Sequence, residues 1–346
     1  MNVKKAGTLP HLTVALVGPV PSGGVKLLQE NLVTNCSFRL FPETREDEGL
    51  RQKLQGTDVV LGQYFSARMA QAAKGLKLLH AMGAGVDDFN LSALSSQTTV
   101  SNVYFHGPAI GEFVMMMVLA LSRNLVETDA QLRKGMWHGS WIWGAPPADE
   151  IQGKVLGIIG FGHIGREAGA RAHAFGMSVR ALSAHPPARR PKTVDFWGGP
   201  EKLPELLRES DYVVLACPLN DRTRGLIGAQ EFGWMKPSAS LINIARAGVV
   251  EEAALYEALS KRRIRSAAVD VWYRYALGGK RSTPSALPFH KLTNLIMTPH
   301  IAGWTTGTFD RRFRAIADNI DRLATGRPLL NVVQGPVRHT VGKRAR

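Results

Sequence analysis

The residues around a histidine near the end of the chain are of types that could do acid–base chemistry. His300 stands in a Thr-Pro-His turn that closes a segment beginning at Val269, and Asp270 is the only acid in that segment. Imidazole gains and loses a proton near neutral pH, and a neighbouring carboxylate stabilises its charged form. Because no Asp or Glu occurs from Val271 to Pro299, the sequence leaves open which group sets the charge on His300.

A glycine-rich loop in the middle of the chain could hold a phosphate-bearing cofactor. The motif GFGHIG directly follows the apolar run VLGII and directly precedes REAGARAHAF, which has a helical pattern. Glycines permit a tight turn and a close approach of the backbone to a pyrophosphate, and the helix start favours its negative charge. The alternative, a turn that happens to be glycine-rich, fits this strand–loop–helix context poorly. The expected cofactor-binding residues here are Gly160, Gly162, His163, Ile164 and Gly165.

The end of the next apolar run bears on which dinucleotide would bind. In NAD-binding units an acid about 20 residues after the loop binds the ribose hydroxyls. The run MSVRALSA ends near Ser183, no acid follows before Asp195, and the intervening residues include the bases His185, Arg189, Arg190 and Lys192. A hydroxyl and arginines suit a 2′-phosphate, whereas a carboxylate would repel it. We therefore predict NADP over NAD, with Ser183 and Arg189 at the ribose; the alternative is a solvated basic loop and a Ser183 that accepts either cofactor.

Composition sets limits on the kind of protein. With 346 residues, 45% of them hydrophobic, the chain can form two domains. The net charge of +15 suits an anionic partner, but no nucleic-acid-binding motif accompanies it, and we expect the basic residues 338–346 to form a solvated tail. Cys36 and Cys217 lie too far apart in sequence for a disulfide framework or a metal site, so we expect a reducing cytoplasm and no metal.

Two apolar stretches resemble membrane-directed segments only superficially. LTVALVG near the N-terminus stops at Gly18-Pro19, which is too early for a signal peptide, and it predicts a buried strand. FVMMMVLAL at 113–121 is far shorter than the roughly 20 residues that span a bilayer and predicts a buried helix. We expect no membrane partner.

The order of apolar runs indicates how these residues are positioned. The first third alternates short apolar runs with helical patterns, and a second such series begins near Gly153. This alternation predicts an α/β protein with two doubly wound, Rossmann-like domains built on parallel sheets. Near the end, Phe313, Ile316, Ile320 and Leu323 recur at helical spacing, which predicts an amphipathic helix that ends near Gly326.

Six segments together resemble the D-isomer-specific 2-hydroxyacid dehydrogenase family, in order and over nearly the whole chain. They are LLHAMGAGVDDFN, SNVYFHGPAIGEFVMMMVLALSR, GKVLGIIGFGHIG, CPLNDRTRGLIG, MKPSASLINIARAGVVEEAALYEAL and TPHIAGWT. The resemblance implies a discontinuous, flavodoxin-like substrate domain of residues 1–103 and 305–346 around an inserted NAD(P)-binding Rossmann domain of residues 104–304. It also implies a homodimer. The tryptophans of GMWHGSWIWG (135–144) would lie at the dimer interface or, equally, be buried within one chain.

The resemblance also implies roles for individual residues. Arg246 matches the arginine that holds the substrate's carboxylate and carbonyl, although Ala247 stands where the family usually has glycine. His300 matches the proton donor and acceptor. Asp270 matches a residue that faces the nicotinamide carboxamide, and a turn cap is its alternative role. Further implied residues are Cys217, Pro218, Ala245 and Gly303 at the cofactor, and Gly83, Ala84, Gly85 and Val86, whose backbone amides would bind the substrate carboxylate.

The family's third catalytic residue is a glutamate five positions after the Asp270 position, where this chain has Tyr275. A neutral phenol can hydrogen-bond to imidazole but adds no negative charge, so His300 should be neutral more often than its counterparts. That would weaken His300 as an acid for reduction and leave it competent as a base for oxidation.

Three functions remain open on these residues. The favoured one is hydride transfer between NAD(P)H and a small 2-keto acid or D-2-hydroxy acid of the glyoxylate or hydroxypyruvate class. A second is different chemistry, as in formate oxidation, which needs no proton transfer. The third is a cofactor-binding regulator without turnover, against which the presence of Arg246 and His300 argues.

Overall fold

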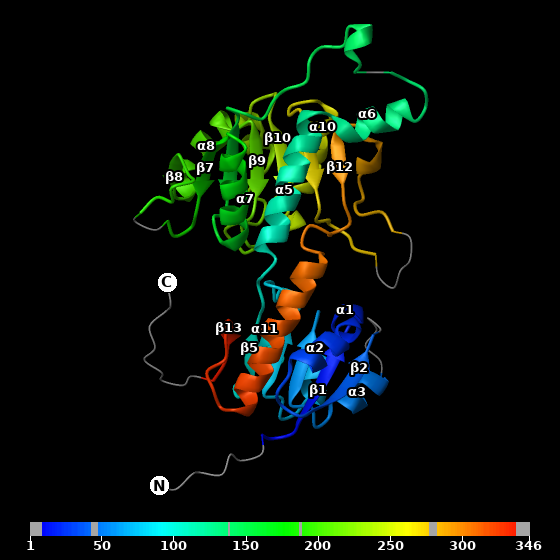
Figure 1. The fold of residues 1–346 in the computed structure, drawn as a ribbon, viewed down its shortest axis with the longest axis vertical. Coiled ribbons are helices and arrows are strands. Elements are labelled where there is room, and N and C mark those ends of the chain that lie inside the picture. The colour runs from blue at the N-terminus through cyan, green and yellow to red at the C-terminus, as the bar shows by residue number, and fades with distance from the viewer. Residues whose placement is uncertain (1–8, 43–47, 138, 187–188, 277–281, 337–346) are drawn as a thin grey trace. The chain divides into compact units, whose positions relative to one another are not determined.

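The computed structural model describes residues 9–42, 48–137, 139–186, 189–276 and 282–336. It divides the chain into two compact units (Figure 1): unit 1 is Met1–Phe105 with Thr306–Arg346, and unit 2 is His106–Thr305. The C-terminal residues for which a solvated tail is expected lie outside the described residues.

Unit 1 is built on a six-stranded sheet in the order β13-β5-β4-β3-β1-β2. Strands β1 to β5 pair in parallel in the flavodoxin-like order, and only β13 runs antiparallel, along the edge of β5. Strands β3 and β4 are buried on both faces, as their continuous apolar runs predict. The strands are β1 Leu12–Val17, β2 Cys36–Phe41, β3 Val59–Gly62, β4 Leu78–Ala81, β5 Thr99–Ser101 and β13 Val332–Gln334.

The amphipathic C-terminal helix belongs to unit 1. Phe313, Ile316 and Ile320 of α11 are fully buried in one core with residues of β1 and α2, as their spacing predicts. The fit is close: a Cβ at Gly24 would stand 1.9 Å from the Phe313 ring. The helices of this unit are α1 Pro19–Gly23, α2 Val25–Asn31, α3 Glu48–Leu54, α4 Ala67–Ala72 and α11 Thr306–Ala324, with the 3-10 helix η1 Leu91–Ala93.

Unit 2 is built on a seven-stranded, fully parallel sheet in the order β12-β11-β10-β9-β6-β7-β8. The order reverses at β6, which pairs with β7 on one side and β9 on the other, as in doubly wound dinucleotide-binding folds. The two sheets confirm the predicted fold class. The strands are β6 Val155–Ile159, β7 Ser178–Leu182, β8 Phe196–Gly198, β9 Tyr212–Leu215, β10 Ser240–Asn243, β11 Ser266–Val269 and β12 Leu295–Met297.

Helix α5 contains the apolar stretch FVMMMVLAL, and it is largely buried against α7 and the sheet of unit 2, as predicted. No single described helix is long and apolar enough to cross a bilayer; α5 and α6 reach that length only as a pair, bent by 58° where they meet. The helices of unit 2 are α5 Gly107–Ser122, α6 Leu125–Leu132, α7 His163–Ala174, α8 Leu203–Glu209, α9 Ala229–Trp234 and α10 Glu252–Ser260, with 3-10 helices η2 Trp141–Trp143, η3 Pro200–Lys202, η4 Ala247–Val249 and η5 Phe289–Lys291.

The tryptophan-rich segment after α6 is not packed within the chain. Trp137, Trp141 and Trp143 are 57%, 85% and 73% exposed. Of the two interpretations of these tryptophans, burial within one chain is therefore wrong. Exposed aromatic side chains gathered in one short segment are typical of an interaction surface.

A buried histidine connects three segments of unit 1. His80 on β4 donates from Nδ1 to the Ala81 carbonyl at 2.9 Å, and its Nε2 accepts from the Asn319 amide at 3.0 Å. The same amide group of Asn319 pairs in both directions with the backbone of Leu330. Burial lowers the pKa of His80 to about 4, so the ring is neutral at physiological pH.

This burial predicts a pH-dependent contribution to stability. An unfolded histidine has a pKa of about 6.5, so the contribution of His80 is complete above that pH and is lost as the pH falls towards 4, by roughly 3 kcal/mol in total. The free-energy difference between wild type and His80→Gln, from urea unfolding followed by far-UV circular dichroism, should therefore shrink between pH 7 and pH 4.5. His290→Gln, which removes an exposed histidine, is the control; an unchanged difference for His80→Gln would contradict the assignment.

Candidate active site

Most residues with a predicted chemical role in unit 2 lie at one edge of its sheet. Because all seven strands are parallel, their carboxyl ends share an edge, which is where open α/β sheets bind ligands. A predicted site residue lies within three residues of the carboxyl end of each of six strands: Gly160 after β6, Ser183 after β7, Cys217 after β9, Ala245 and Arg246 after β10, Asp270 after β11 and His300 after β12.

The three motif glycines serve different purposes. Gly160 has a φ of 101°, and a Cβ there would lie 2.5 Å from the Cys217 nitrogen; a Cβ at Gly165 would lie 2.3 Å from the Gly160 carbonyl oxygen. These two glycines allow the loop to pack on the sheet. Around Gly162, by contrast, a Cβ would meet nothing within 4 Å, so this position is open to a ligand.

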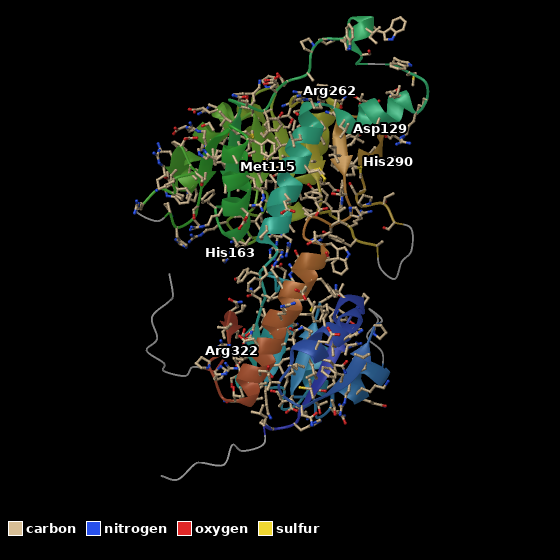
Figure 2. All side chains as sticks on the ribbon, in the orientation of Figure 1. Met115, Asp129, His163, Arg262, His290 and Arg322 are labelled. Atoms are coloured by element: carbon tan, nitrogen blue, oxygen red, sulfur yellow. The ribbon has the colours of Figure 1, made fainter. Side chains whose placement is uncertain are left out.

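The helix that follows the loop offers positive charge at the same place. Gly162 is the N-cap of α7, no side chain caps it, and the first turn contains no acid. His163 lies exposed in that turn (Figure 2). Uncapped amides and an open glycine together fit the pyrophosphate of a dinucleotide.

The acid that follows β7 in the chain lies away from the carboxyl end of that strand. The first acid after Ser183 is Asp195, and its carboxylate accepts from Ser178 Oγ and the Val179 amide, both at 2.8 Å, at the opposite end of β7. These hydrogen bonds lower the pKa of Asp195. The Ser183 hydroxyl accepts weakly from the His185 amide at 3.4 Å, and Arg189 is exposed.

Cys217 and Pro218 follow β9, and the glycine loop packs against the backbone of Ala216 and Cys217. Burial raises the pKa of the Cys217 thiol to about 11, so the thiol is protonated and unreactive at neutral pH. The Pro218 carbonyl accepts from Thr223 Oγ1 at 2.6 Å. Both residues therefore shape the site without offering a nucleophile.

Arg246 is placed by its neighbours on the same turn. The buried Asn243 donates to the Arg246 carbonyl and accepts from the Ala245 amide, both at 3.1 Å. The half-buried guanidinium donates to the Ala245 carbonyl at 2.9 Å. Ala247 begins the 3-10 helix η4, a right-handed conformation that alanine adopts without strain, so glycine is not required there.

Asp270 holds the turn on both sides of His300. Its carboxylate, 1% exposed, accepts from Thr298 Oγ1 at 2.7 Å, the Ile301 amide at 2.8 Å and the Ala302 amide at 2.9 Å. His300 itself has a φ of 60°, which is uncommon for a residue other than glycine. These contacts are those of a turn cap, the alternative role considered for Asp270, and contact with a nicotinamide remains a prediction.

Tyr275 lies beside His300. Its hydroxyl oxygen is 3.0 Å from His300 Nδ1, and the Trp272 amide donates to the same oxygen at 3.3 Å. Because Trp272 occupies a lone pair, the phenol proton can point to Nδ1, which leaves the neutral imidazole with its own proton on Nε2. When the imidazole is charged, Nδ1–H can donate to the other lone pair of the phenol oxygen.

Sequence reasoning missed the contribution of Trp272 and Thr298. The Trp272 indole donates to the Thr298 carbonyl at 2.8 Å. The segment that follows β11 therefore holds the turn after β12 through Trp272 as well as through Asp270. In the sequence, only the position of Trp272 between Asp270 and Tyr275 could have indicated a role for it. Its hydrogen-bond partner could not be predicted, because the contact forms only when β11 and β12 pair.

In unit 1 the loop of Gly83, Ala84, Gly85 and Val86 follows β4. The loop is held through its carbonyls: Gly83 accepts from the Val103 amide at 3.1 Å, and Ala84 accepts from the Asn102 side chain at 2.7 Å. None of the four amides donates to another group in the described part of the chain. Adjacent unused amides fit an anion, and Asn102, which sequence reasoning missed, positions them.

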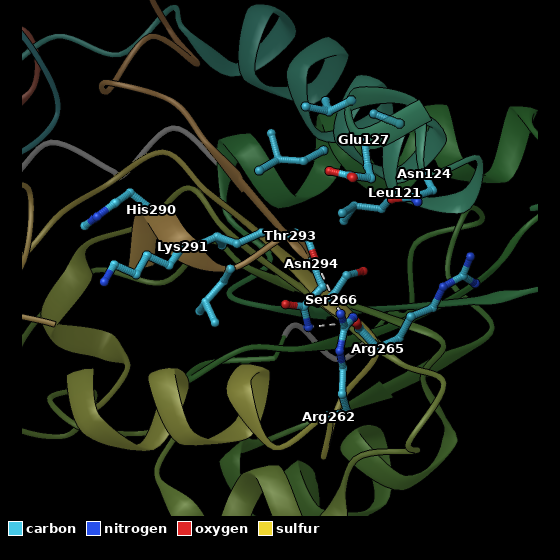
Figure 3. A pocket seen from close by; sticks show the side chains of 15 residues that line it. Leu121, Asn124, Glu127, Arg262, Arg265, Ser266, His290, Lys291, Thr293 and Asn294 are labelled. Atoms are coloured by element: carbon cyan, nitrogen blue, oxygen red, sulfur yellow. Dashed lines mark hydrogen bonds between the residues drawn. The ribbon is translucent and has the colours of Figure 1, made fainter. Parts of the chain in front are cut away.

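A separate cavity of about 440 Å³ lies in unit 2 at the amino ends of β11 and β12 (Figure 3). Its lining includes Arg265, Ser266 and Asn294, and the Asn294 amide donates to the Leu259 and Arg265 carbonyls. This cavity is at the edge of the sheet opposite His300, so it is not part of the candidate site.

Comparison with known proteins gives consistent matches. A model described as the NAD binding domain of D-isomer specific 2-hydroxyacid dehydrogenase matches residues 115–302. Over 327 residues the chain is 30% identical to glyoxylate reductase of Thermococcus gammatolerans, covering 90% of this chain and 93% of the relative. An acyclic imino acid reductase, solved in complex with NADPH and D-Arg, has a TM-score of 0.79 and 26% identity over 93% of this chain and 100% of its own.

Another relative is longer than this chain. The match to D-3-phosphoglycerate dehydrogenase of Methanocaldococcus jannaschii is 30% identical over 331 residues, covering 93% of this chain but only 59% of that protein. The chain thus spans little more than half of this relative.

The glycine geometry predicts opposite outcomes for two alanine substitutions. Gly160→Ala should destabilise the fold by about 2 kcal/mol or more, because of its positive φ and the close Cys217 backbone. Gly162→Ala should change the free energy of unfolding by less than about 1 kcal/mol but weaken dinucleotide binding, because the methyl group would occupy the open position. Thermal unfolding and fluorescence titration with NADPH and NADH measure both effects; wild-type affinity in Gly162→Ala would rule out the proposed pyrophosphate position.

Proposed function

The chain belongs to the D-isomer-specific 2-hydroxyacid dehydrogenase family, and we propose that it transfers a hydride between NAD(P)H and a small 2-keto acid or D-2-hydroxy acid. The observation that carries this proposal is the placement of Arg246 and His300 at the same sheet edge as the glycine loop. Glyoxylate and hydroxypyruvate are the first substrates to examine, since glyoxylate reductase is among the relatives.

Each part of the reaction has a residue suited to it. The bound nicotinamide supplies or accepts the hydride. The Arg246 guanidinium binds the substrate carboxylate and polarises the carbonyl oxygen, for which its planar fork is suited. His300 gives a proton to the new alkoxide or removes one from the alcohol. In unit 1, the unused amides of residues 83–86 are suited to binding an anion.

The phenol of Tyr275 changes how His300 works. It orients the ring through Nδ1, and we propose that Nε2 exchanges the proton with the substrate. Unlike a carboxylate it does not stabilise imidazolium, so the charged acid form is less favoured. We propose that the pair favours oxidation, or reduction at lower pH, compared with a pair that contains glutamate.

We propose NADP as the preferred cofactor. Supporting this, the first acid after Ser183 in the chain, Asp195, is engaged at the other end of the strand, and Arg189 is exposed after Ser183. A neutral hydroxyl and a cation attract a 2′-phosphate that a carboxylate would repel.

A second candidate is the reduction of a 2-imino acid. A protonated imine accepts a hydride at carbon without needing a proton from the protein, so a pair that lacks a carboxylate suffices. The same holds for hydride removal from formate. The specific observation in favour is Tyr275 at His300 Nδ1, together with the similarity to an imino acid reductase.

We also propose that the protein is a homodimer in a reducing, cytoplasmic compartment. The exposed tryptophans of residues 137–143 would cover apolar surface on a second copy. Both cysteines, Cys36 and Cys217, are free, as thiols of a reducing compartment are.

A substrate panel with both cofactors tests the proposed function. We expect turnover of glyoxylate or hydroxypyruvate, with a KM for NADPH at least about tenfold below that for NADH, a ratio worth about 1.4 kcal/mol. Ser183→Asp should reverse the cofactor preference by repelling the 2′-phosphate.

The same panel should include keto acids with added methylamine, and formate. Turnover only with amine present would favour imine reduction, and turnover only with formate would favour the formate-type reaction. Cofactor binding without turnover of any substrate would contradict a catalytic function and favour a regulator.

A further inference from the structure

Tyr273 joins two segments of unit 2 that carry proposed catalytic residues. Its hydroxyl donates to the Val250 carbonyl at 3.0 Å. Val250 is the C-cap of η4, the 3-10 helix that begins directly after Arg246. Tyr273 also stands two residues before Tyr275, whose hydroxyl oxygen lies 3.0 Å from His300 Nδ1. One side chain thus connects the turn of Arg246 with the segment that contacts His300.

The backbone between Val250 and Arg246 is short and internally hydrogen-bonded. The Val250 amide donates to the Ala247 carbonyl at 2.9 Å, and the Val249 amide donates to the Arg246 carbonyl at 3.2 Å. Val249 and Val250 are both buried. Because this turn is closed by its own hydrogen bonds, a displacement of the Val250 carbonyl moves the backbone that carries the Arg246 guanidinium.

Tyr275 depends on the residues before it for its position. Its side chain is 51% exposed, and the residues on either side of it are exposed as well, so packing holds it only weakly. The two residues that fix this segment are Trp272, which donates to the turn of His300, and Tyr273, which donates to the turn of Arg246. The contact between Tyr275 and His300 therefore relies on both anchors.

The Tyr273 ring is held by stacking as well as by its hydroxyl. It lies nearly parallel to the buried Phe289 ring, with ring centroids 6.5 Å apart and an angle of 17° between the planes. Burial and, to a lesser extent, the nearby Glu252 raise the pKa of Tyr273 above its usual value. The hydroxyl therefore stays protonated at physiological pH and remains a donor to Val250.

We propose that Tyr273 is a positioning residue that holds the Tyr275–His300 pair in place against the turn of Arg246. This inference rests on the proposed function, in which Arg246 binds the substrate and His300 exchanges a proton with it. Both residues must meet one small molecule, and a displacement of about 1 Å can cost about 100-fold in rate. Tyr273 acts only through the two segments that it joins.

Tyr256 of α10 provides a matched control. It also packs on Phe289, edge to face with ring centroids 5.4 Å apart, and it is half-buried like Tyr273. Its hydroxyl forms no hydrogen bond within the described part of the chain. Tyr256→Phe therefore removes a hydroxyl from the same aromatic cluster without separating the two segments.

The experiment compares wild type, Tyr273→Phe and Tyr256→Phe on the best substrate of the panel, at saturating concentrations of the preferred cofactor. Phenylalanine keeps a ring on Phe289 and removes only the hydrogen bond to Val250. Tyr273→Phe should lower kcat by about 5- to 50-fold, since the reacting groups are no longer aligned. Its cofactor KM should stay within about twofold, and its thermal unfolding midpoint within about 3 °C of wild type. Tyr256→Phe should keep the wild-type kcat within about twofold.

Three kinetic outcomes would overturn the proposal. The first is a wild-type kcat in Tyr273→Phe, and the second is an equal loss in Tyr256→Phe. The third is a loss of kcat in Tyr273→Phe that is matched by an equal loss of cofactor-binding sites per chain, because Tyr273 would then only support the fold.

A measurement without turnover separates failure of this inference from failure of the proposed function. Nitrogen resonances of the His300 ring report which nitrogen carries the proton, and the phenol of Tyr275 favours the Nε2–H tautomer. Tyr273→Phe should decrease the share of this tautomer, whereas Tyr256→Phe should leave it unchanged. If the share decreases as expected but no substrate is turned over, the positioning role stands and the proposed function fails. An unchanged share in Tyr273→Phe would overturn the positioning role whether or not a substrate is turned over.

Discussion

The buried carboxylate of Asp270 is the contact on which the candidate catalytic centre depends. It joins the end of β11 to the turn after β12 through three hydrogen bonds, and that turn carries His300 in an uncommon backbone conformation. Such a conformation persists where its surroundings over-determine it. The one acid of the segment from Val269 to Trp304 thus acts on geometry, because it fixes where the imidazole lies.

Placement and charge of the histidine are consequently governed by different residues. Asp270 and Trp272 hold the turn, whereas Tyr275 contacts the ring nitrogen. A phenol that is itself hydrogen-bonded to the Trp272 amide orients the ring as a carboxylate would, but it contributes no negative charge. In the proposed function, Tyr275 orients His300 without supplying a negative charge, which is why reactions that need no proton from the protein are also candidates.

Much of the fold was predictable because buried parallel strands form continuous apolar runs. The strands that sequence reasoning missed, β8, β12 and β13, are only three residues long and half-buried or exposed, so their apolar runs are too short to indicate a strand. Motif residues such as Gly160 could be placed because they lie at or just after the end of a strand. Asn102 could not, because its side chain reaches the Ala84 carbonyl only once β4 and β5 pair in the fold of unit 1.

Titration of the His300 imidazole by ¹⁵N nuclear magnetic resonance, assigned with His300→Gln, tests the role of Tyr275 without requiring a known substrate. The hydrogen bond from the phenol predicts that the neutral ring carries its proton on Nε2. Tyr275→Glu should raise the pH at which the ring becomes charged by about one unit, since a carboxylate stabilises imidazolium, and Tyr275→Phe should weaken the tautomer preference. The same titration midpoint in wild type and Tyr275→Glu would contradict the account, because it would show that another group sets the charge on His300.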